Sequence, residues 1–402
     1  MNEQKITVLG VGGAGCRILR QISLTPGAEK LRLLALDSDT GSLEESGLPP
    51  ENRIIAGMNL RSGRGCGGNE ILGRSAVAVE RPRLGKILEG TDVLLIIGGL
   101  GGGLCTGGLP VILGIARTMH ITTMLMLSLP FAMEGYGRRK QADDRICADL
   151  LPLADCLIAL PNDLLFSTLP PETPLAQALE LADTEMARTA MALSSILFAG
   201  NVFSTDISTF SAMLKPNALC SIGVGVAPAN EENAVEKAIE KMMLSPLLGG
   251  PAELQRSDAV VFTVIGGPGL SLGNAKNALE LANSQLDKSL ERTVLLGAGT
   301  SPEWDDFIQI TALTVRYTDK SAVKPVSAVS AVPGAKPRTA QRGTAIQRKV
   351  ASASDSSFVQ QTLELDTIDK GIMENSTPDI FNGEDLDIPT FKRHGIVVDP
   401  GK

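Results

Sequence analysis

Short apolar runs alternate with more polar, amphipathic stretches along the first 170 or so residues of the chain. Continuous apolar runs bounded by Gly, Pro or Asp are typical of strands that are buried on both faces of a sheet. The runs that predict such strands are residues 5–10, 31–36, 93–97, 121–128 and 156–160. Because helical stretches separate them, we expect an α/β fold with a doubly wound, Rossmann-like parallel sheet.

The pattern changes after this region. Residues 175–198 form an Ala-rich run without Pro or Gly, which predicts one helix of roughly 35 Å, buried between two layers. Beyond it, four apolar runs predict strands and two amphipathic stretches predict helices, as in an α+β domain with a mixed sheet. The strands are expected at residues 220–226, 259–265, 293–297 and 308–315, and the helices at 231–243 and 272–286.

The last part of the chain has a different composition. From about Thr318 to about Ser376, Ser, Ala, Pro, Lys, Arg and Gln dominate without apolar periodicity, which predicts a disordered linker. A short apolar motif follows, with acidic residues before it and basic residues after it. On a flexible tether, such a motif indicates a peptide that binds a partner, and the alternative is a frayed terminus. Its residues are Asp387, Ile388, Pro389, Phe391, Lys392 and Arg393.

Composition narrows the class of protein. Hydrophobic residues make up 43% of the chain and aromatic residues only 3%, so we expect an aliphatic core. The net charge of −8 argues against nucleic-acid binding. No signal peptide or long uncharged apolar run is evident, which predicts a soluble, cytoplasmic protein. Six cysteines without a CxxC pair, and two histidines, predict free thiols rather than a metal site.

The most distinctive stretch is a glycine-rich segment, residues 98–110, between the strand at 93–97 and a helix expected to open at Val111. Such a segment suits phosphate, because bare backbone N–H groups approach the oxygens and the helix N-terminus adds a favourable dipole. Thr106 adds a hydroxyl. The alternative is a flexible linker, but linkers are Ser-rich and lack flanking apolar strands.

Two further glycine clusters accompany this segment. Residues 10–15 match G-x-G-x-x-G between a strand and a helix, and Asp37 follows the next strand. Alone, this pattern predicts a Rossmann domain, and an NAD-dependent enzyme is kept as an alternative. A third glycine cluster lies at residues 63–69. Three glycine-rich turns favour a site that encloses the phosphate tail of a single nucleotide over a dinucleotide site. The chain has no G-x-x-x-x-G-K-[ST] motif, which excludes a P-loop.

Together, these motifs resemble the tubulin superfamily, and within it the FtsZ family of bacterial division proteins. Residues 101–107, GGGLCTG, are similar to its GGGTGTG signature. The resemblance covers nearly the whole chain, in family order, at residues 8–15, 36–40, 65–69 with 73–74, 101–107, 130–135, 161–163, 201–206, 245–248 and 387–391.

The resemblance implies five regions. They are a GTPase domain (1–172), a central helix (173–199), a C-terminal activation domain (200–317), a linker (318–378) and a partner-binding peptide (379–402). It also implies that the protein binds GTP or GDP with Mg²⁺. The subunits would stack head to tail into filaments, and GTP would be hydrolysed at the interface between neighbouring subunits. The peptide would bind division proteins and membrane tethers at the cytoplasmic division site.

The resemblance also implies roles for single residues. Asp206 would polarise the attacking water in the neighbouring subunit's site, and Glu134 and Arg138 would contact the ribose region. The first loop would cradle the α- and β-phosphates, and the signature loop the β- and γ-phosphates. The remaining nucleotide-binding positions are Gly12, Gly13, Ala14, Gly15, Cys16, Arg17, Gly68, Gly101, Gly102, Gly103, Cys105, Thr106, Gly107, Asp183 and Thr184.

Several departures from the family pattern bear on activity. Leu104 replaces a hydroxyl-bearing Thr near the γ-phosphate, and Phe203 stands where the acidic loop has its first acid. Losing such a preorganised group typically costs on the order of 10²–10³ in rate, so slow hydrolysis is expected. The family's base-reading Asp aligns with Thr184, and Asp183 points about 100° away on an ideal helix. These departures keep open a second reading, a non-catalytic scaffold or regulator that binds nucleotide weakly and co-assembles.

Overall fold

A computed structural model describes residues 5–166, 169–170, 172–198, 207–287 and 290–318, and two short strands near the C-terminus. The chain divides into two units, Met1–Ala331 and Val332–Lys402. In the second unit, β11 (Ile380–Phe381) and β12 (Glu384–Asp385) pair antiparallel. The predicted linker beyond Thr318 and the motif from Asp387 to Arg393 lie outside the described residues.

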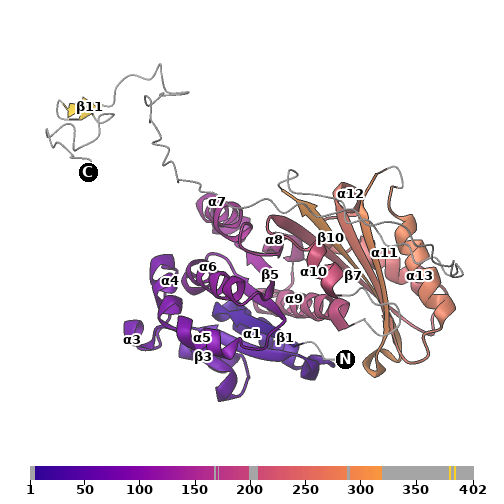
Figure 1. Cartoon of the computed structure of the whole chain (residues 1–402), viewed down its shortest axis with the longest axis horizontal. Coiled ribbons are helices and arrows are strands. Elements are labelled where there is room, and N and C mark those ends of the chain that lie inside the picture. Colours follow the sequence, from indigo (N-terminus) through magenta and orange to yellow (C-terminus); the bar gives the residue numbers. More distant parts are fainter. Residues whose placement is uncertain are drawn as a thin grey trace, which may run out of the picture. The chain divides into compact units, whose positions relative to one another are not determined.

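The first unit contains one ten-stranded sheet in the order β3-β2-β1-β4-β5-β6-β7-β10-β8-β9. All pairs from β3 to β7 are parallel, whereas β10 runs antiparallel to both β7 and β8. Figure 1 shows the purple N-terminal strands and the orange C-terminal strands. The strands are β1 (Ile6–Val11), β2 (Arg32–Asp37), β3 (Arg53–Ile55), β4 (Val93–Gly99), β5 (Thr122–Leu129), β6 (Cys156–Pro161), β7 (Ala218–Pro228), β8 (Ala259–Gly266), β9 (Thr293–Thr300) and β10 (Phe307–Tyr317).

Helices connect these strands in the α/β order expected from the sequence, which confirms the predicted fold class. The predicted central helix is α9, with the expected bounds Leu175–Phe198. The others are α1 (Gly12–Ser23), α2 (Thr40–Glu45), α3 (Met58–Arg61), α4 (Glu70–Val79), α5 (Arg81–Ile87), α6 (Gly103–Thr118), α7 (Tyr136–Arg145), α8 (Asn162–Phe166), α10 (Ile207–Met213), α11 (Ala234–Met243), α12 (Pro251–Arg256) and α13 (Leu272–Ser284).

One helix begins earlier than predicted. We expected a glycine-rich loop to reach Pro110 and the helix to open at Val111, but α6 already begins at Gly103 and contains Pro110 in its interior. The reason is tertiary packing. A Cβ at Gly107 would lie 1.9 Å from the carbonyl oxygen of Glu70 in α4, so glycine here lets the two helices touch backbone to backbone. Part of the glycine-rich stretch therefore serves helix contact.

The sheet is covered on both faces. One core cluster joins α1, α9 and the strands from β1 to β10, and it includes Leu19, Leu193 and Leu313. A second cluster, with Leu84 of α5 and Ile112 of α6, covers the other face of the parallel strands. A third lies under α11 and α13. The central helix thus packs between α1 on one side and β7 and β10 on the other, in agreement with its predicted place between two layers.

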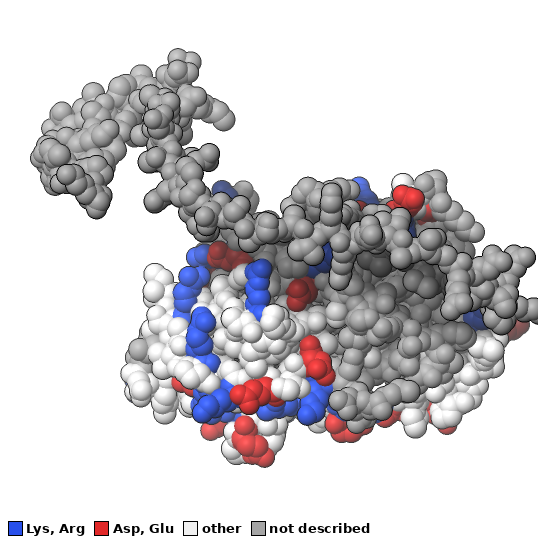
Figure 2. All heavy atoms as spheres, in the orientation of Figure 1, with Lys and Arg blue, Asp and Glu red and all other residues white. Residues whose placement is uncertain are grey.

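The mixed C-terminal sheet continues the parallel one rather than standing apart. Only two register pairs link β6 to β7, Leu157 with Leu219 and Ile158 with Cys220. The predicted domain boundaries at residues 172, 199 and 317 stay predictions. Acidic and basic side chains lie interspersed over the described N-terminal elements in Figure 2. Within the described parts of the chain, no helix has the length and apolarity needed to cross a membrane.

Candidate functional site

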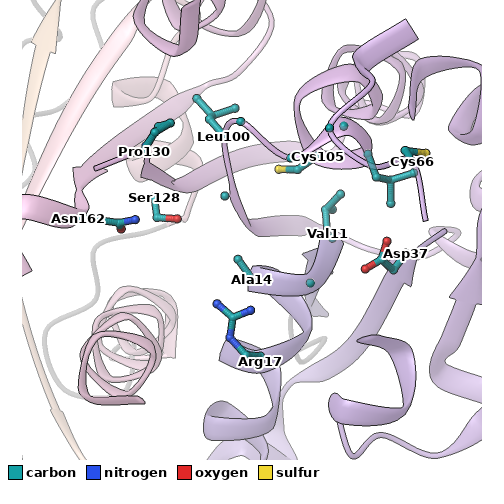
Figure 3. A pocket seen from close by; sticks show the side chains of 18 of the residues that line it. Val11, Ala14, Arg17, Asp37, Cys66, Leu100, Cys105, Ser128, Pro130 and Asn162 are labelled. Atoms are coloured by element: carbon teal, nitrogen blue, oxygen red, sulfur yellow. The ribbon is translucent and has the colours of Figure 1, made fainter. Parts of the chain in front are cut away.

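A cavity of about 450 Å³ opens where the carboxyl ends of β1, β2, β4, β5 and β6 meet α9 (Figure 3). In open α/β sheets, ligands bind outside the carboxyl ends of the strands. The lining comprises Val11, Gly12, Gly13, Ala14, Arg17, Asp37, Ser38, Gly65, Cys66, Gly67, Gly68, Gly99, Leu100, Gly101, Gly102, Gly103, Leu104, Cys105, Ser128, Pro130, Phe131, Glu134, Arg138, Asn162, Leu179, Ala182, Asp183 and Met186.

The N-termini of α1 and α6 both lie at this cavity. Their N-cap residues, Val11 and Gly102, make no side-chain capping hydrogen bond, and neither first turn carries an acid. The first N–H groups of a helix have no partner within the helix, and together with the helix dipole they favour an anion. Two such helix ends at one cavity suit a ligand with several phosphate groups.

Glycine is required where these two helices begin. Gly12 has φ +73° and Gly101 has φ +95°, in the left-handed region that side chains disfavour. The turn after Gly101 is held from within, because the Thr106 hydroxyl accepts a hydrogen bond from the Gly101 N–H at 2.9 Å. The glycines therefore leave bare backbone facing the cavity.

A buried carboxylate lies beside the glycine loops. Asp37, 4% exposed, accepts hydrogen bonds from the backbone N–H groups of Ser38 (2.6 Å) and Asp39 (3.3 Å). Burial raises the pKa of Asp37, and those two bonds lower it again in part. Figure 3 shows Asp37 and Cys66 on one side of the cavity, away from Ser128 and Asn162. An ionised Asp37 would repel a phosphate bound nearby.

The turn after β5 forms another wall. The carboxylate of Glu134 accepts from the Phe131 N–H at 3.0 Å and from Arg138 at 2.8 Å. Asp163, which follows β6, accepts from the Ala132 N–H at 3.2 and 3.0 Å. These bonds hold the predicted ribose-contacting pair, Glu134 and Arg138, together at the cavity wall.

An ion pair crosses the cavity between α1 and α9. Nε of Arg17 donates to Oδ2 of Asp183 at 2.9 Å, and the Asp183 side chain is only 14% exposed. Burial raises the pKa of Asp183, and the charge of Arg17 opposes that rise. Asp183, one of the predicted nucleotide-binding residues, thus lines the cavity, whereas Thr184, with which the family's base-reading Asp aligns, does not.

Most of the predicted nucleotide-binding residues come together here. Those in the cavity lining are Gly12, Gly13, Ala14, Arg17, Gly68, Gly101, Gly102, Gly103, Cys105, Glu134, Arg138 and Asp183.

Two predicted glycines lie outside the lining, and both serve packing. A Cβ at Gly15 would lie 2.6 Å from the carbonyl oxygen of Ile97, so this glycine lets α1 approach β4. Gly107 lets α6 approach Glu70 of α4, as described above.

Three other predicted residues also lie outside the lining. Cys16 is fully buried in the core, and burial raises its pKa to about 12. The hydroxyl of Thr106 is engaged with Gly101. The hydroxyl of Thr184 donates to the carbonyl oxygen of Glu180 in its own helix, at 2.8 Å. The predicted catalytic Asp206, and Phe203, lie outside the described residues.

Sequence reasoning missed several lining residues. Ser128 and Asn162 each stand just at the end of a strand, β5 or β6, and that position could have indicated them. Leu179, Ala182 and Met186 belong to one face of α9, at a helical spacing that reads from sequence as ordinary core. Nothing in the sequence distinguishes this face of α9 from the faces of the same helix that pack into the core.

These features define an α/β protein with a cavity suited to the phosphate groups of a nucleotide. The model of the tubulin/FtsZ family GTPase domain matches residues 5–170, and that of the FtsZ family C-terminal domain matches residues 218–316. The chain belongs to the tubulin/FtsZ family of GTP-binding cytoskeletal proteins.

Solved structures agree with this assignment. An empty FtsZ dimer from M. jannaschii is 26% identical, with a TM-score of 0.68 over 78% of this chain and 88% of that one. CetZ2 from Haloferax volcanii, solved as a GTPγS-bound protofilament, is 20% identical, with a TM-score of 0.62 over 77% of this chain and 92% of that one. CetZ1 from the same organism, a GDP-bound monomer, is 19% identical, with a TM-score of 0.64 over 77% and 94%. The two CetZ structures share the fold with this chain.

Proposed function

We propose that the cavity binds GTP and GDP, and that copies of the chain stack head to tail into filaments that hydrolyse GTP. The observation that carries the proposal is the meeting of two uncapped helix N-termini and bare glycine turns at one cavity. The M. jannaschii FtsZ dimer and the H. volcanii CetZ2 protofilament support assembly of related chains. In such a stack, Asp206 of one subunit would meet the nucleotide of the next.

The proposed site uses Mg²⁺ bound mainly to the nucleotide. The described residues contain no group of three or more His, Cys, Asp or Glu side chains that could hold a metal. The phosphate oxygens would therefore be its principal ligands, and the ion would neutralise charge on the terminal phosphate. The chain's own contribution is to hold the phosphates on the backbone N–H groups at the starts of α1 and α6.

Hydrolysis in this member is proposed to be slow. Leu104, in the first turn of α6, lines the cavity and supplies no hydroxyl where the family pattern has a Thr. Phe203 removes one acid from the loop that would reach the neighbouring nucleotide. The loss of one preorganised polar group typically costs on the order of 10²–10³ in rate. A turnover rate ordinary for filament-forming GTPases, measured in assembled protein, would contradict this part of the proposal.

The cellular role proposed is that of a cytoplasmic filament in the bacterial division ring. The motif from Asp387 to Arg393 would bind division proteins and membrane tethers. Leu104 and Phe203 favour one alternative, a scaffold that co-assembles without hydrolysis. Filaments that form with GTP and persist without phosphate release would favour that alternative.

Sedimentation of the full chain tests the proposal. With GTP and Mg²⁺, protein should pellet above a critical concentration, whereas with GDP or without nucleotide it should stay in the supernatant. Pelleting that is equal in all three conditions would indicate aggregation and contradict nucleotide-driven assembly.

The tail has a separate test. Deletion of residues 387–402 should leave GTP-dependent pelleting intact and abolish binding to division proteins in a pull-down assay. Survival of that binding would mean that the peptide assignment is wrong.

A further inference from the structure

A second cavity lies at the opposite end of the parallel strands from the nucleotide cavity. It has a volume of about 240 Å³ and forms where the amino ends of β5 and β6 meet the C-terminal end of α6 and part of α10. Pockets for drug-sized ligands measure about 300–1,000 Å³, so this cavity suits a smaller molecule. Its polar lining residues are Arg117, His120, Thr122, Thr123, Asp155 and Ser211.

His120 adopts a backbone conformation that usually belongs to glycine. Its φ is +56°, in the left-handed region, directly after α6 ends. The N–H of Ile121 donates to the carbonyl oxygen of Ala116 at 3.0 Å, and this bond closes the helix end. Glycine is the usual residue at such a position, because a side chain adds strain there. A histidine held at that cost beside a cavity indicates a use for its imidazole.

Three side chains around this cavity have hydrogen-bonding groups to spare. Among the described residues, neither the guanidinium of Arg117 nor the imidazole of His120 has a hydrogen-bond or ion-pair partner. The carboxylate of Asp155 is held through Oδ2, which accepts from the N–H of Thr123 at 2.8 Å and from its hydroxyl at 2.9 Å. The other oxygen, Oδ1, has no partner in the part of the chain that the structure describes.

Neutral groups complete the lining. The hydroxyl oxygens of Thr122 and Ser211 lie 3.3 Å apart and share one hydrogen bond, and each can also accept a bond from a ligand. Leu153 and Pro216 add apolar surface. The cavity thus combines cationic donors from the end of α6, a fixed carboxylate oxygen just before β6 and a small apolar wall.

We propose that this cavity binds a free α-amino acid with a small aliphatic side chain. The carboxylate of the ligand accepts from Arg117 and His120, and its ammonium group donates to Oδ1 of Asp155. The aliphatic side chain lies against Leu153 and Pro216. Each spare polar group of the cavity then has a partner. The site is separate from the nucleotide cavity, so its test needs no nucleotide.

Other small ligands leave one end of the cavity unmatched. A monocarboxylate has no donor for Asp155, and a simple amine has no acceptor for Arg117. A dicarboxylate would bring a second anion beside Asp155. Polar or charged groups that lose water without gaining a partner weaken binding.

Titration calorimetry with the full chain, in the absence of nucleotide, tests the inference. The ligands are L-alanine, L-valine and L-leucine, with two analogues of leucine. One analogue, 4-methylpentanoate, lacks the amino group, and the other, 3-methylbutylamine, lacks the carboxylate. At least one amino acid should bind with a dissociation constant of about 1 mM or below, and both analogues should bind about tenfold or more weakly than leucine. Binding of 4-methylpentanoate equal to that of leucine would overturn the inference in favour of a simple anion site. Absence of binding by all three amino acids at about 10 mM would overturn it outright.

Variants at the end of α6 give a second readout. Arg117→Ala should weaken amino-acid binding by about tenfold or more. Arg256→Ala is the matched control, because Arg256 is likewise an exposed arginine in the last turn of a helix, α12, and lies outside this cavity lining. His120→Gly should weaken binding while the urea midpoint stays at or above that of the wild type, because glycine relieves the backbone strain. Unchanged amino-acid binding in both Arg117→Ala and His120→Gly would contradict the assignment.

Discussion

The contact between α4 and α6 makes a sharp prediction for two glycines of one helix. Gly107 faces α4, where an added Cβ would lie 1.9 Å from the Glu70 carbonyl oxygen and 2.8 Å from the Arg74 nitrogen. Gly114 lies two turns further along α6, and an added Cβ there meets nothing within 4 Å. The substitutions Gly107→Ala and Gly114→Ala thus add the same methyl group to the same helix in opposite environments.

The expected magnitudes follow from these distances. An ordinary van der Waals contact begins at 3.4 Å, so Gly107→Ala forces the two helix backbones apart by about 1.5 Å. Overpacking a well-packed contact costs about 1–3 kcal/mol, and a rigid backbone obstacle puts this site at about 3 kcal/mol. Gly114→Ala should instead stabilise the protein by about 0.5–1 kcal/mol, because alanine loses less backbone entropy in a helix.

Urea unfolding without nucleotide, followed by circular dichroism, measures both effects. Gly107→Ala should lower the midpoint clearly and Gly114→Ala should raise it slightly. Gly107→Ala should also weaken GTP binding, because Gly67 and Gly68, just before α4, line the cavity. If Gly107→Ala weakens GTP binding without lowering stability, the glycine contacts phosphate directly and the packing explanation is wrong.

Three further predictions concern charges and thiols. Burial raises the pKa of Asp37 above its value in the unfolded chain. The folded state therefore loses stability as the pH rises from the unfolded pKa to the folded pKa, because the buried carboxyl must then ionise. Asp37→Asn should therefore stabilise the chain at pH 8, by an amount that shrinks toward about pH 4. It should also tighten triphosphate binding roughly tenfold, and an unchanged affinity in a titration at pH 8 would contradict the expected repulsion. Iodoacetamide at pH 8 should label the exposed Cys147 first, and peptide mapping should find Cys105, whose pKa burial raises to about 12, unlabelled until unfolding. The exposed ion pair between Lys30 and Glu303, at 3.1 Å, should matter little, so Lys30→Ala should change the free energy of unfolding by less than about 1 kcal/mol.

The sequence predicts the larger features of the fold well, because they depend on long apolar patterns. The central helix, Leu175–Phe198, has the expected bounds, since nothing within it breaks a helix. The start of α6 at Gly103 was not predictable, because it depends on how closely α4 approaches. A run of glycines reads the same in sequence whether it faces phosphate, as Gly101 does, or a neighbouring helix, as Gly107 does.

The candidate site shows the same limit. Strand ends followed by glycines locate the phosphate end of the cavity, because that geometry is local in sequence. Arg17 and Asp183 are far apart along the chain, and their pairing depends on how α1 packs against α9. A shift of one residue on a helix turns a side chain by about 100°, so the sequence predicted both Asp183 and Thr184 without deciding between them, and only Asp183 lines the cavity.

The proposed nucleotide site is completed by a second subunit. The most direct test is the rate of GTP hydrolysis per subunit against protein concentration, for the wild type, Asp206→Ala and the control Glu236→Ala in α11. In the wild type and the control alike, the rate should be near zero at low concentration and rise steeply above a critical concentration. In Asp206→Ala the rise should be absent although GTP still binds. A rate per subunit that is independent of concentration, or that is unchanged in Asp206→Ala, would contradict the shared site.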